Sequence, residues 1–206
     1  RGYFYIMHRF QVDSLAFVRR CHELKLVSSI SVGVKDYDHQ FVASLKQHGL
    51  VPNFVTIDVA HAHSDRVRKM VQLVKAMLPT TFLIVGNIAT VTAARDLTTW
   101  GADMIKVGIG PGSVCTTKNK TGFGTADWQL SALQLIHQAT KLPLILDGGL
   151  REPGDIAKSI RFGATFCMLG YMLAGFIESP GKLIKRNSRQ FKSFYGSASH
   201  LNQQTK

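Results

Sequence analysis

The sequence has few cysteines, few acidic residues and no long apolar run, and each shortage excludes a class of protein. Its three cysteines, Cys21, Cys115 and Cys167, show neither the paired spacing of a disulfide framework nor the spacing of a zinc site. Such cysteine usage is typical of a reducing compartment, so we expect a cytoplasmic protein. No apolar stretch has the length needed to cross a bilayer, so we expect no membrane partner.

Acidic residues are about half as numerous as basic ones. The chain of 206 residues has 13 Asp and Glu against 25 Lys and Arg, a formal net charge of +12. This balance favours anionic partners such as nucleotides and phosphates. The basic residues are spread along the chain except for a modest cluster at 182–192, which we interpret as solvated surface and not as a nucleic-acid site.

Short apolar runs alternate with amphipathic stretches along the chain. The runs are rich in Val, Ile and Phe, as expected of strands covered on both faces, and occupy residues 3–10, 28–34, 53–60, 81–87, 104–110, 142–147 and 165–169. Between them, residues 64–77 place Val67, Met70, Val71 and Val74 on one helical face. The alternation, with no linker, predicts one α/β domain over residues 1–206 with seven parallel strands.

A glycine-rich loop follows the fifth run and contains the residues best suited to covalent chemistry. A Gly-Pro-Gly turn at residues 110–112 ends the strand, and Cys115 follows with Lys118 and Lys120 close behind. Lysines and free backbone N–H groups would stabilise a thiolate at this position. The alternative is a loop cysteine without chemistry, and the loop alone leaves both interpretations open.

The loop and its flank resemble a known family. Residues 108–117 (GIGPGSVCTT) are similar to the catalytic loop of the IMP dehydrogenase and GMP reductase family. Residues 122–125 (GFGT) and 128–130 (WQL) resemble its GMP reductase branch, of the bacterial type. The resemblance extends from Gly2 to about Ser199.

The resemblance implies a fold and a reaction. The fold would be a (β/α)₈ TIM barrel with seven of its eight strands in this chain, and the reaction would convert GMP to IMP and ammonia with NADPH. Cys115 would attack C2 of guanine to form a thioimidate, and Thr117 would assist proton transfer to the leaving ammonia. The carbonyls of Gly110, Gly112 and Cys115 would hold a monovalent cation such as K⁺. The family also implies a homotetramer.

Residues 147–149 (DGG) end the sixth run and form the expected nucleotide site. A carboxylate there can accept two ribose hydroxyls while glycine N–H groups meet a phosphate, although a plain turn could have the same sequence. By resemblance, Asp147 binds the ribose, within a nucleotide-holding segment from Leu144 to Cys167. The resemblance also implies substrate contacts from Ser113, Gly148, Gly149, Gly170, Tyr171, Gly196 and Ser197, of which Tyr171 departs from the small residue usual there.

The end of the third run is the expected cofactor site. By resemblance, the nicotinamide dinucleotide would contact Asp58, Val59, Ala60, Asn87, Ile109 and Gly110. From the residues alone, His61 and His63 could instead ligate zinc, although tetrahedral zinc would need further ligands.

Two alternatives to a reductase remain open. IMP dehydrogenases commonly carry a regulatory domain inserted soon after the first run, whereas here Phe10 continues directly into Gln11. The other alternative is a non-catalytic fragment that retains a nucleotide pocket. By resemblance, we expect this chain to lack the family's first barrel strand and the flap glutamate that lies beyond residues 195–199 (YGSAS). On that expectation the 206-residue chain itself would be inactive.

Overall fold

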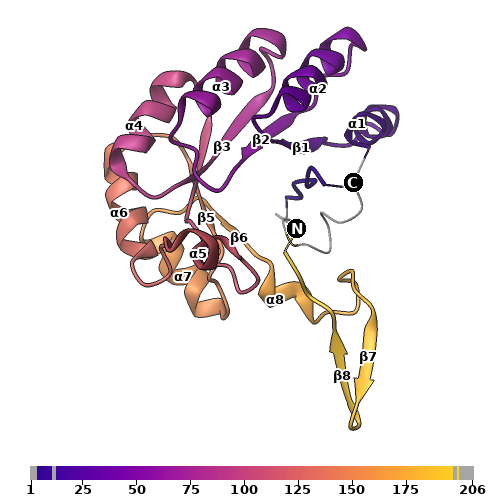
Figure 1. Cartoon of the computed structure of the whole chain (residues 1–206), viewed down its shortest axis with the longest axis vertical. Coiled ribbons are helices and arrows are strands. Elements are labelled where there is room, and N and C mark those ends of the chain that lie inside the picture. The colour runs from indigo at the N-terminus through magenta and orange to yellow at the C-terminus, as the bar shows by residue number, and fades with distance from the viewer. Residues whose placement is uncertain (1–3, 11–12, 197–198, 200–206) are drawn as a thin grey trace.

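A curved parallel sheet organises the chain. The computed structural model describes residues 4–10, 13–196 and 199. Six strands run in the order β1-β2-β3-β4-β5-β6, each pairing in parallel with the next. They are β1 (Ser29–Val32), β2 (Phe54–Asp58), β3 (Phe82–Ile88), β4 (Met104–Val107), β5 (Leu144–Asp147) and β6 (Phe166–Met168). The sheet curls into part of a barrel, which confirms the predicted fold class (Figure 1).

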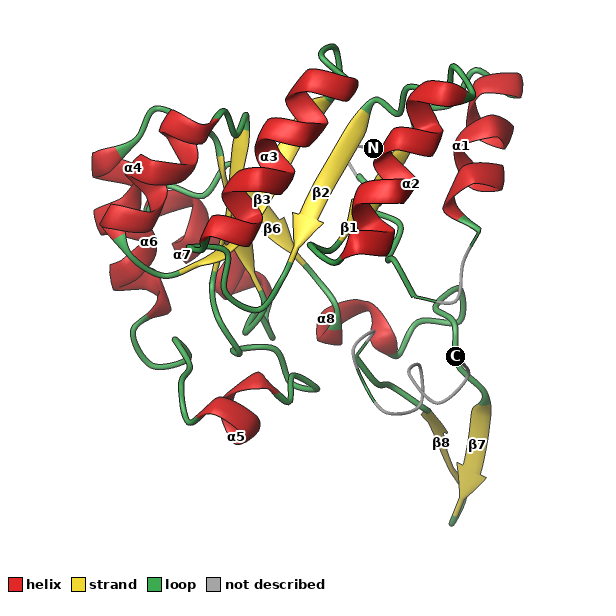
Figure 2. Ribbon diagram, turned by 45° about the horizontal axis from the view of Figure 1, so that its top comes forward, coloured by secondary structure: helices red, strands yellow, loops and turns green. Residues whose placement is uncertain are grey.

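Helices cover the convex side of this sheet (Figure 2). They are α1 (Ser14–Glu23), α2 (Asp36–Gln47), α3 (Asp65–Met77), α4 (Val91–Trp100), α6 (Gln129–Ala139) and α7 (Pro153–Arg161). In α3 the Ser64 hydroxyl caps the first turn by accepting from the amide of Val67. The buried face of α3 is Val67, Met70, Val71 and Val74, as predicted.

Both faces of the sheet are apolar, which explains the unbroken apolar runs in the sequence. The outer face and the helices form the main core, which includes Leu83, Val85 and Ile105. On the inner face Ile84, Met104 and Ile145 form a second, smaller cluster. Alternate residues of each strand therefore serve the two sides, as the pleat requires.

The two ends of the chain differ from the expected pattern. Of the run expected at residues 3–10, the described residues contribute one parallel bridge, between Met7 and Ile30, instead of a continuous strand. After β6 come a short helix, α8 (Tyr171–Ala174), and an antiparallel hairpin of β7 (Leu183–Arg186) and β8 (Arg189–Lys192). The hairpin projects away from the sheet (Figure 1). Its turn residues Asn187 and Ser188 both have positive φ, as a type I′ turn requires.

Within the described residues, we find no helix that combines the length and apolar character needed to span a membrane.

Candidate active site

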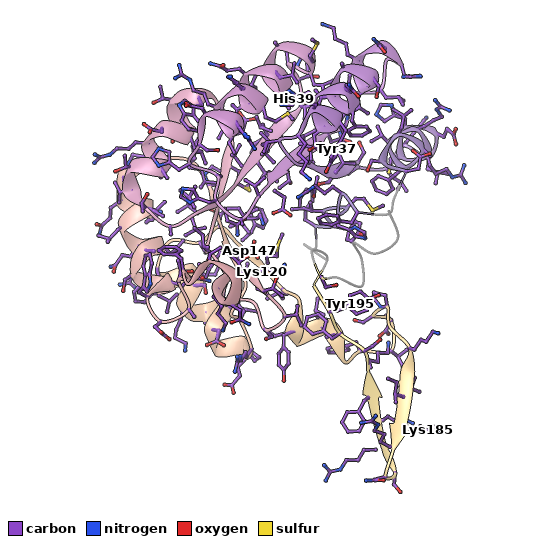
Figure 3. The ribbon with its side chains drawn as sticks, viewed as in Figure 1. Tyr37, His39, Lys120, Asp147, Lys185 and Tyr195 are labelled. Atoms are coloured by element: carbon purple, nitrogen blue, oxygen red, sulfur yellow. The ribbon has the colours of Figure 1, made fainter. Side chains whose placement is uncertain are left out.

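The carboxyl ends of the parallel strands surround a cavity of about 520 Å³. This is the edge of a barrel where loops gather, and the volume suits a small-molecule site. Figure 3 shows Asp147 facing the middle of the curve with Tyr195 across from it, while Lys185 lies far out on the hairpin. A second cavity, of about 340 Å³, is lined by residues at the start of α6, and Cys115 is not among its lining residues.

The glycine-rich loop leaves β4 through Gly108, a position that only glycine can occupy. Its φ is 124°, and a Cβ there would lie 2.7 Å from both the carbonyl oxygen of Asp147 and Oε1 of Gln129. The chain then turns so that the amide of Cys115 donates to the carbonyl of Gly112 at 3.0 Å. A five-residue helix, α5 (Thr117–Thr121), follows. The half-buried Cys115 thus lines the cavity between this turn and α5.

Two buried side chains tie the cysteine loop to residues 147–149. The amide of Ile109 donates to the Thr125 hydroxyl at 3.0 Å, and that hydroxyl donates to Oε1 of Gln129 at 2.8 Å. Nε2 of Gln129 then donates to the carbonyl of Gly148 at 2.8 Å. In the sequence, Thr125 and Gln129 stand out only as part of the family resemblance, which gives no sign of this role. Nε1 of Trp128, immediately before α6, donates to the carbonyl of Gly124 at 3.2 Å.

A buried lysine joins two carboxylates at the centre of the site. The side chain of Lys106 is 4% exposed, and its Nζ donates to Oδ1 of Asp58 at 2.8 Å and to Oδ2 of Asp147 at 2.5 Å. Burial opposes the charged form, but the two carboxylates hold the pKa of Lys106 above its ordinary value. For Asp58, burial favours the neutral carboxyl, yet Lys106 and then Arg9 hold its pKa below the ordinary value. Lys106 and Asp58 are therefore both charged.

Sequence reasoning missed Lys106. The available signal was a single charged residue within the apolar run Met104–Val107, where every residue is buried. A lysine is almost never fully buried unless it is paired, so its place in this run was itself an indication of a partner.

Asn87 completes this polar cluster. Its Nδ2 donates to the carbonyl of Gly108 at 2.5 Å and to Oδ2 of Asp147 at 2.7 Å. Its Oδ1 is buried and has no hydrogen-bond partner in the described part of the chain. A buried acceptor without a partner is costly, so this oxygen is suited to an N–H donor of a bound molecule.

Comparison with known proteins shows which family the chain belongs to. Residues 12–206 match the family described as the IMP dehydrogenase / GMP reductase domain. The chain belongs to this family. A GMP reductase from Streptococcus equi subsp. equi is 57% identical over 199 residues, which are 96% of this chain and 60% of that protein. A GMP reductase from Streptococcus agalactiae is 56% identical with the same coverage. The chain therefore spans 60% of the length of these relatives.

Solved structures agree with the family. A GMP reductase variant from Trypanosoma brucei, in which a cysteine is replaced by alanine, has a TM-score of 0.73 and 38% identity, covering 83% of this chain and 38% of its own. The same variant in complex with guanosine 5′-monophosphate also has a TM-score of 0.73. Similarity at this level supports both the barrel fold and the family.

The family's expected site residues gather around one cavity. The described positions that line it are Asp58, Val59, Ala60, Asn87, Ile109, Gly110, Gly112, Ser113, Cys115, Thr117, Asp147, Gly148, Gly149, Gly170, Tyr171 and Gly196. Ser197 lies outside the described residues. The segment from Leu144 to Cys167 contributes only its residues 147–150 to the cavity lining.

The histidines after β2 make other contacts. Nε2 of His63 lies 2.7 Å from Oδ2 of Asp96, and its ring packs 6.0 Å from that of Trp100, while His61 is exposed. In the part of the chain that the structure describes, no three His, Cys, Asp or Glu residues are close enough to hold a metal ion. The geometry of the described residues therefore does not support the zinc alternative.

Proposed function

We propose that the chain carries the catalytic centre of an NADPH-dependent GMP reductase, which converts GMP to IMP and ammonia. The observation that carries this proposal is the shared cavity, where the Cys115 thiol and the Asp147 carboxylate line one space with Asp58 and Asn87. The named relatives and the GMP-bound structural neighbour support the choice of reaction within the family.

The purine nucleotide would bind along the loop after β5. Oδ1 of Asp147 receives no hydrogen bond from the described residues, so it is available to the ribose hydroxyls. The N–H groups of Gly148 and Gly149, with Ser113, would meet the phosphate. Across the cavity, Gly170, Tyr171, Gly196 and Ser197 would complete the phosphate site. This placement would bring the guanine base toward Cys115.

The nicotinamide dinucleotide would bind at the end of β2 and β3. Asp58, Val59 and Ala60 would hold it, with Asn87, Ile109 and Gly110 beside the reacting ring. The unpartnered Oδ1 of Asn87 fits a carboxamide N–H, which is the donor that nicotinamide offers. When bound, NADPH supplies the hydride.

The thiol of Cys115 would act as the nucleophile. Its sulfur would form a bond to C2 of guanine, ammonia would leave from C2, and hydride addition at C2 would release IMP and restore the thiolate. Covalent catalysis divides one difficult substitution into two easier steps. Thr117 begins α5 two residues after Cys115, and its hydroxyl would assist proton transfer to the departing ammonia.

Three further features stay predictions. A monovalent cation, K⁺, would bind the carbonyls of Gly110, Gly112 and Cys115. The Gly112 carbonyl already accepts from the Cys115 amide, and its second lone pair would serve the cation. The homotetramer and the cytoplasmic location rest on the family resemblance and on cysteine usage.

The proposal is tested by adding GMP to the protein with NADPH. In a version of the protein extended to the length of its curated relatives, we expect loss of NADPH absorbance with ammonia released in equal amount. The 206-residue chain itself is expected to bind GMP without turnover. Reduction of NAD⁺ on addition of IMP would instead assign the protein to the dehydrogenase branch. Failure to bind either GMP or IMP would reject both activities, and binding without turnover in the extended version would show a nucleotide pocket that lacks catalysis.

A further inference from the structure

One ammonium group is shared between two carboxylates that come from different strands. Lys106 lies on β4, Asp147 ends the neighbouring strand β5, and Asp58 ends β2, two strands away in the other direction. To reach Asp58, the Lys106 side chain lies over Gly86 of β3. A Cβ on Gly86 would lie 2.4 Å from the Cβ of Lys106, so the intervening strand has no room for a side chain there.

Each carboxylate has one oxygen committed to this network and one available. Lys106 contacts Oδ1 of Asp58 and Oδ2 of Asp147, and Asn87 contacts that same Oδ2. Among the described residues none donates to Oδ2 of Asp58 or to Oδ1 of Asp147. Both aspartates line the cavity, Asp58 on the side that we assign to the cofactor and Asp147 on the side that we assign to the nucleotide.

We propose that Lys106 is a positioning residue that couples the nucleotide and cofactor subsites. A ligand that hydrogen-bonds to one carboxylate withdraws charge from it and weakens its hold on the ammonium. The ammonium then interacts more strongly with the other carboxylate, which changes that group's orientation and its strength as an acceptor. This coupling rests on the proposed function, which places the two ligands on the two carboxylates.

The network differs from an ordinary structural ion pair in the same fold. At the opposite edge of the sheet, Nζ of Lys75 lies 2.5 Å from Oδ2 of Asp103, which also accepts from the amide of Leu83. That pair fixes the amino end of β3 through the amide of Leu83, and neither of its residues lines either cavity. It provides a matched control, because it contains the same residue types at a similar distance but has no link to the proposed ligands.

The test is a double-mutant cycle read out as GMP affinity without cofactor. Asp58 does not contact GMP in this scheme, so its replacement can reach GMP only through the protein. Asp58→Asn leaves the ammonium with Asp147 alone, which makes Asp147 a weaker acceptor for ribose hydroxyls. We expect GMP affinity to fall about three- to tenfold in the wild-type background and to change less than about twofold in the Lys106→Met background.

Controls separate coupling from loss of structure. Lys75→Met should lower stability. It should not change GMP affinity, and Asp58→Asn should lower GMP affinity in this background as much as in the wild type. Lys106→Arg keeps a cation that can contact two carboxylates and should retain the coupling. If circular dichroism shows that Lys106→Met is unfolded, Lys106→Gln replaces it in the cycle.

The outcomes are distinct. Equal effects of Asp58→Asn in both backgrounds, or an effect below about twofold in the wild type, would overturn the coupling while leaving GMP binding in place. A wild-type chain that does not bind GMP would overturn the proposed function itself, and the coupling with it. A larger effect in the wild type than in the Lys106→Met background supports the proposal.

Discussion

The two edges of the sheet use similar residues for different purposes. At the amino edge, Asp103 precedes β4 and its Oδ2 accepts from both Lys75 and the amide of Leu83. At the carboxyl edge of that same strand, Lys106 contacts two carboxylates that each retain an available oxygen. Asp103 and Lys75 lie away from both cavities, whereas Asp58, Lys106 and Asp147 all line one of them. In a barrel, the first arrangement serves stability and the second serves ligand binding.

The same contrast separates the cysteines. Cys115 lies in the loop that lines the cavity, whereas Cys21 is buried on α1 and Cys167 lies on β6 outside the cavity lining. Position relative to the carboxyl edge, and not residue type, distinguishes the expected nucleophile from the other two. Substitutions and labelling at both edges therefore test whether the two edges have separate roles.

Replacing the nucleophile should give the largest effect. In a version extended to the length of the curated relatives, Cys115→Ala should lower GMP-dependent NADPH oxidation by at least about a thousandfold, because no other group forms the covalent intermediate. GMP affinity should change little, because the thiol makes its decisive contact only after attack. The measurements are NADPH absorbance and GMP titration calorimetry. Turnover that survives the substitution would reject Cys115 as the nucleophile.

Asp147→Ala should have the next largest effect, on binding. It leaves the ribose hydroxyls without their acceptor, at a cost of about 1–3 kcal/mol, or roughly 5- to 150-fold in GMP affinity. Calorimetry measures this loss, and circular dichroism confirms that the variant folds. GMP affinity equal to that of the unmodified chain would show that residues 147–149 are a plain turn.

Labelling with iodoacetamide should distinguish the cysteines by about tenfold or more. Burial raises the pKa of the Cys167 thiol, only partly opposed by its hydrogen bond to Ser159, so less thiolate is present there near neutral pH. Labelling of Cys167 should therefore increase as pH rises toward this raised value. Cys115, which lines the cavity, should be labelled faster than the other two and be protected by GMP. Mass spectrometry of labelled peptides gives the three rates. Equal rates in the folded chain would contradict the assignment.

Asp103→Ala should affect stability alone. It removes the partner of Lys75 and leaves the amide of the buried Leu83 without an acceptor, so unfolding should become easier by about 1–2 kcal/mol. Chemical denaturation measures this change. GMP affinity should stay within about twofold of that of the unmodified chain, since the site lies at the other end of the strands. A larger loss of affinity would mean that the two edges are not separate.

Much of the sheet could be predicted from the sequence. Runs such as 81–87 and 142–147 are apolar because both faces of the sheet are covered, so they appear directly in the sequence. The Gly-Pro-Gly turn before Cys115 also has a local signal, because such a turn ends a strand. The hairpin from Leu183 to Lys192 was missed, since its exposed strands show no buried apolar run.

The partners of buried polar groups could not be predicted in this way. Lys106 appeared only as one charge in an apolar strand, and Gln129 only as part of a family motif. Their contacts cross from one strand or helix to another, to Asp58 and Asp147 in one case and to Thr125 and Gly148 in the other. No periodicity along a chain records which side chain on a distant strand lies within 3 Å.

The sequence by itself determined the parallel α/β architecture, the cysteine loop and the polar residues at the strand ends, because hydrophobic periodicity and turn residues are local properties. Only the tertiary structure decided that Asp58 and Asp147, 89 positions apart in the sequence, share the ammonium of Lys106. Parallel strands bring their carboxyl ends to one edge whatever their separation along the chain. The curvature of the sheet then decides which of those ends come within hydrogen-bond distance.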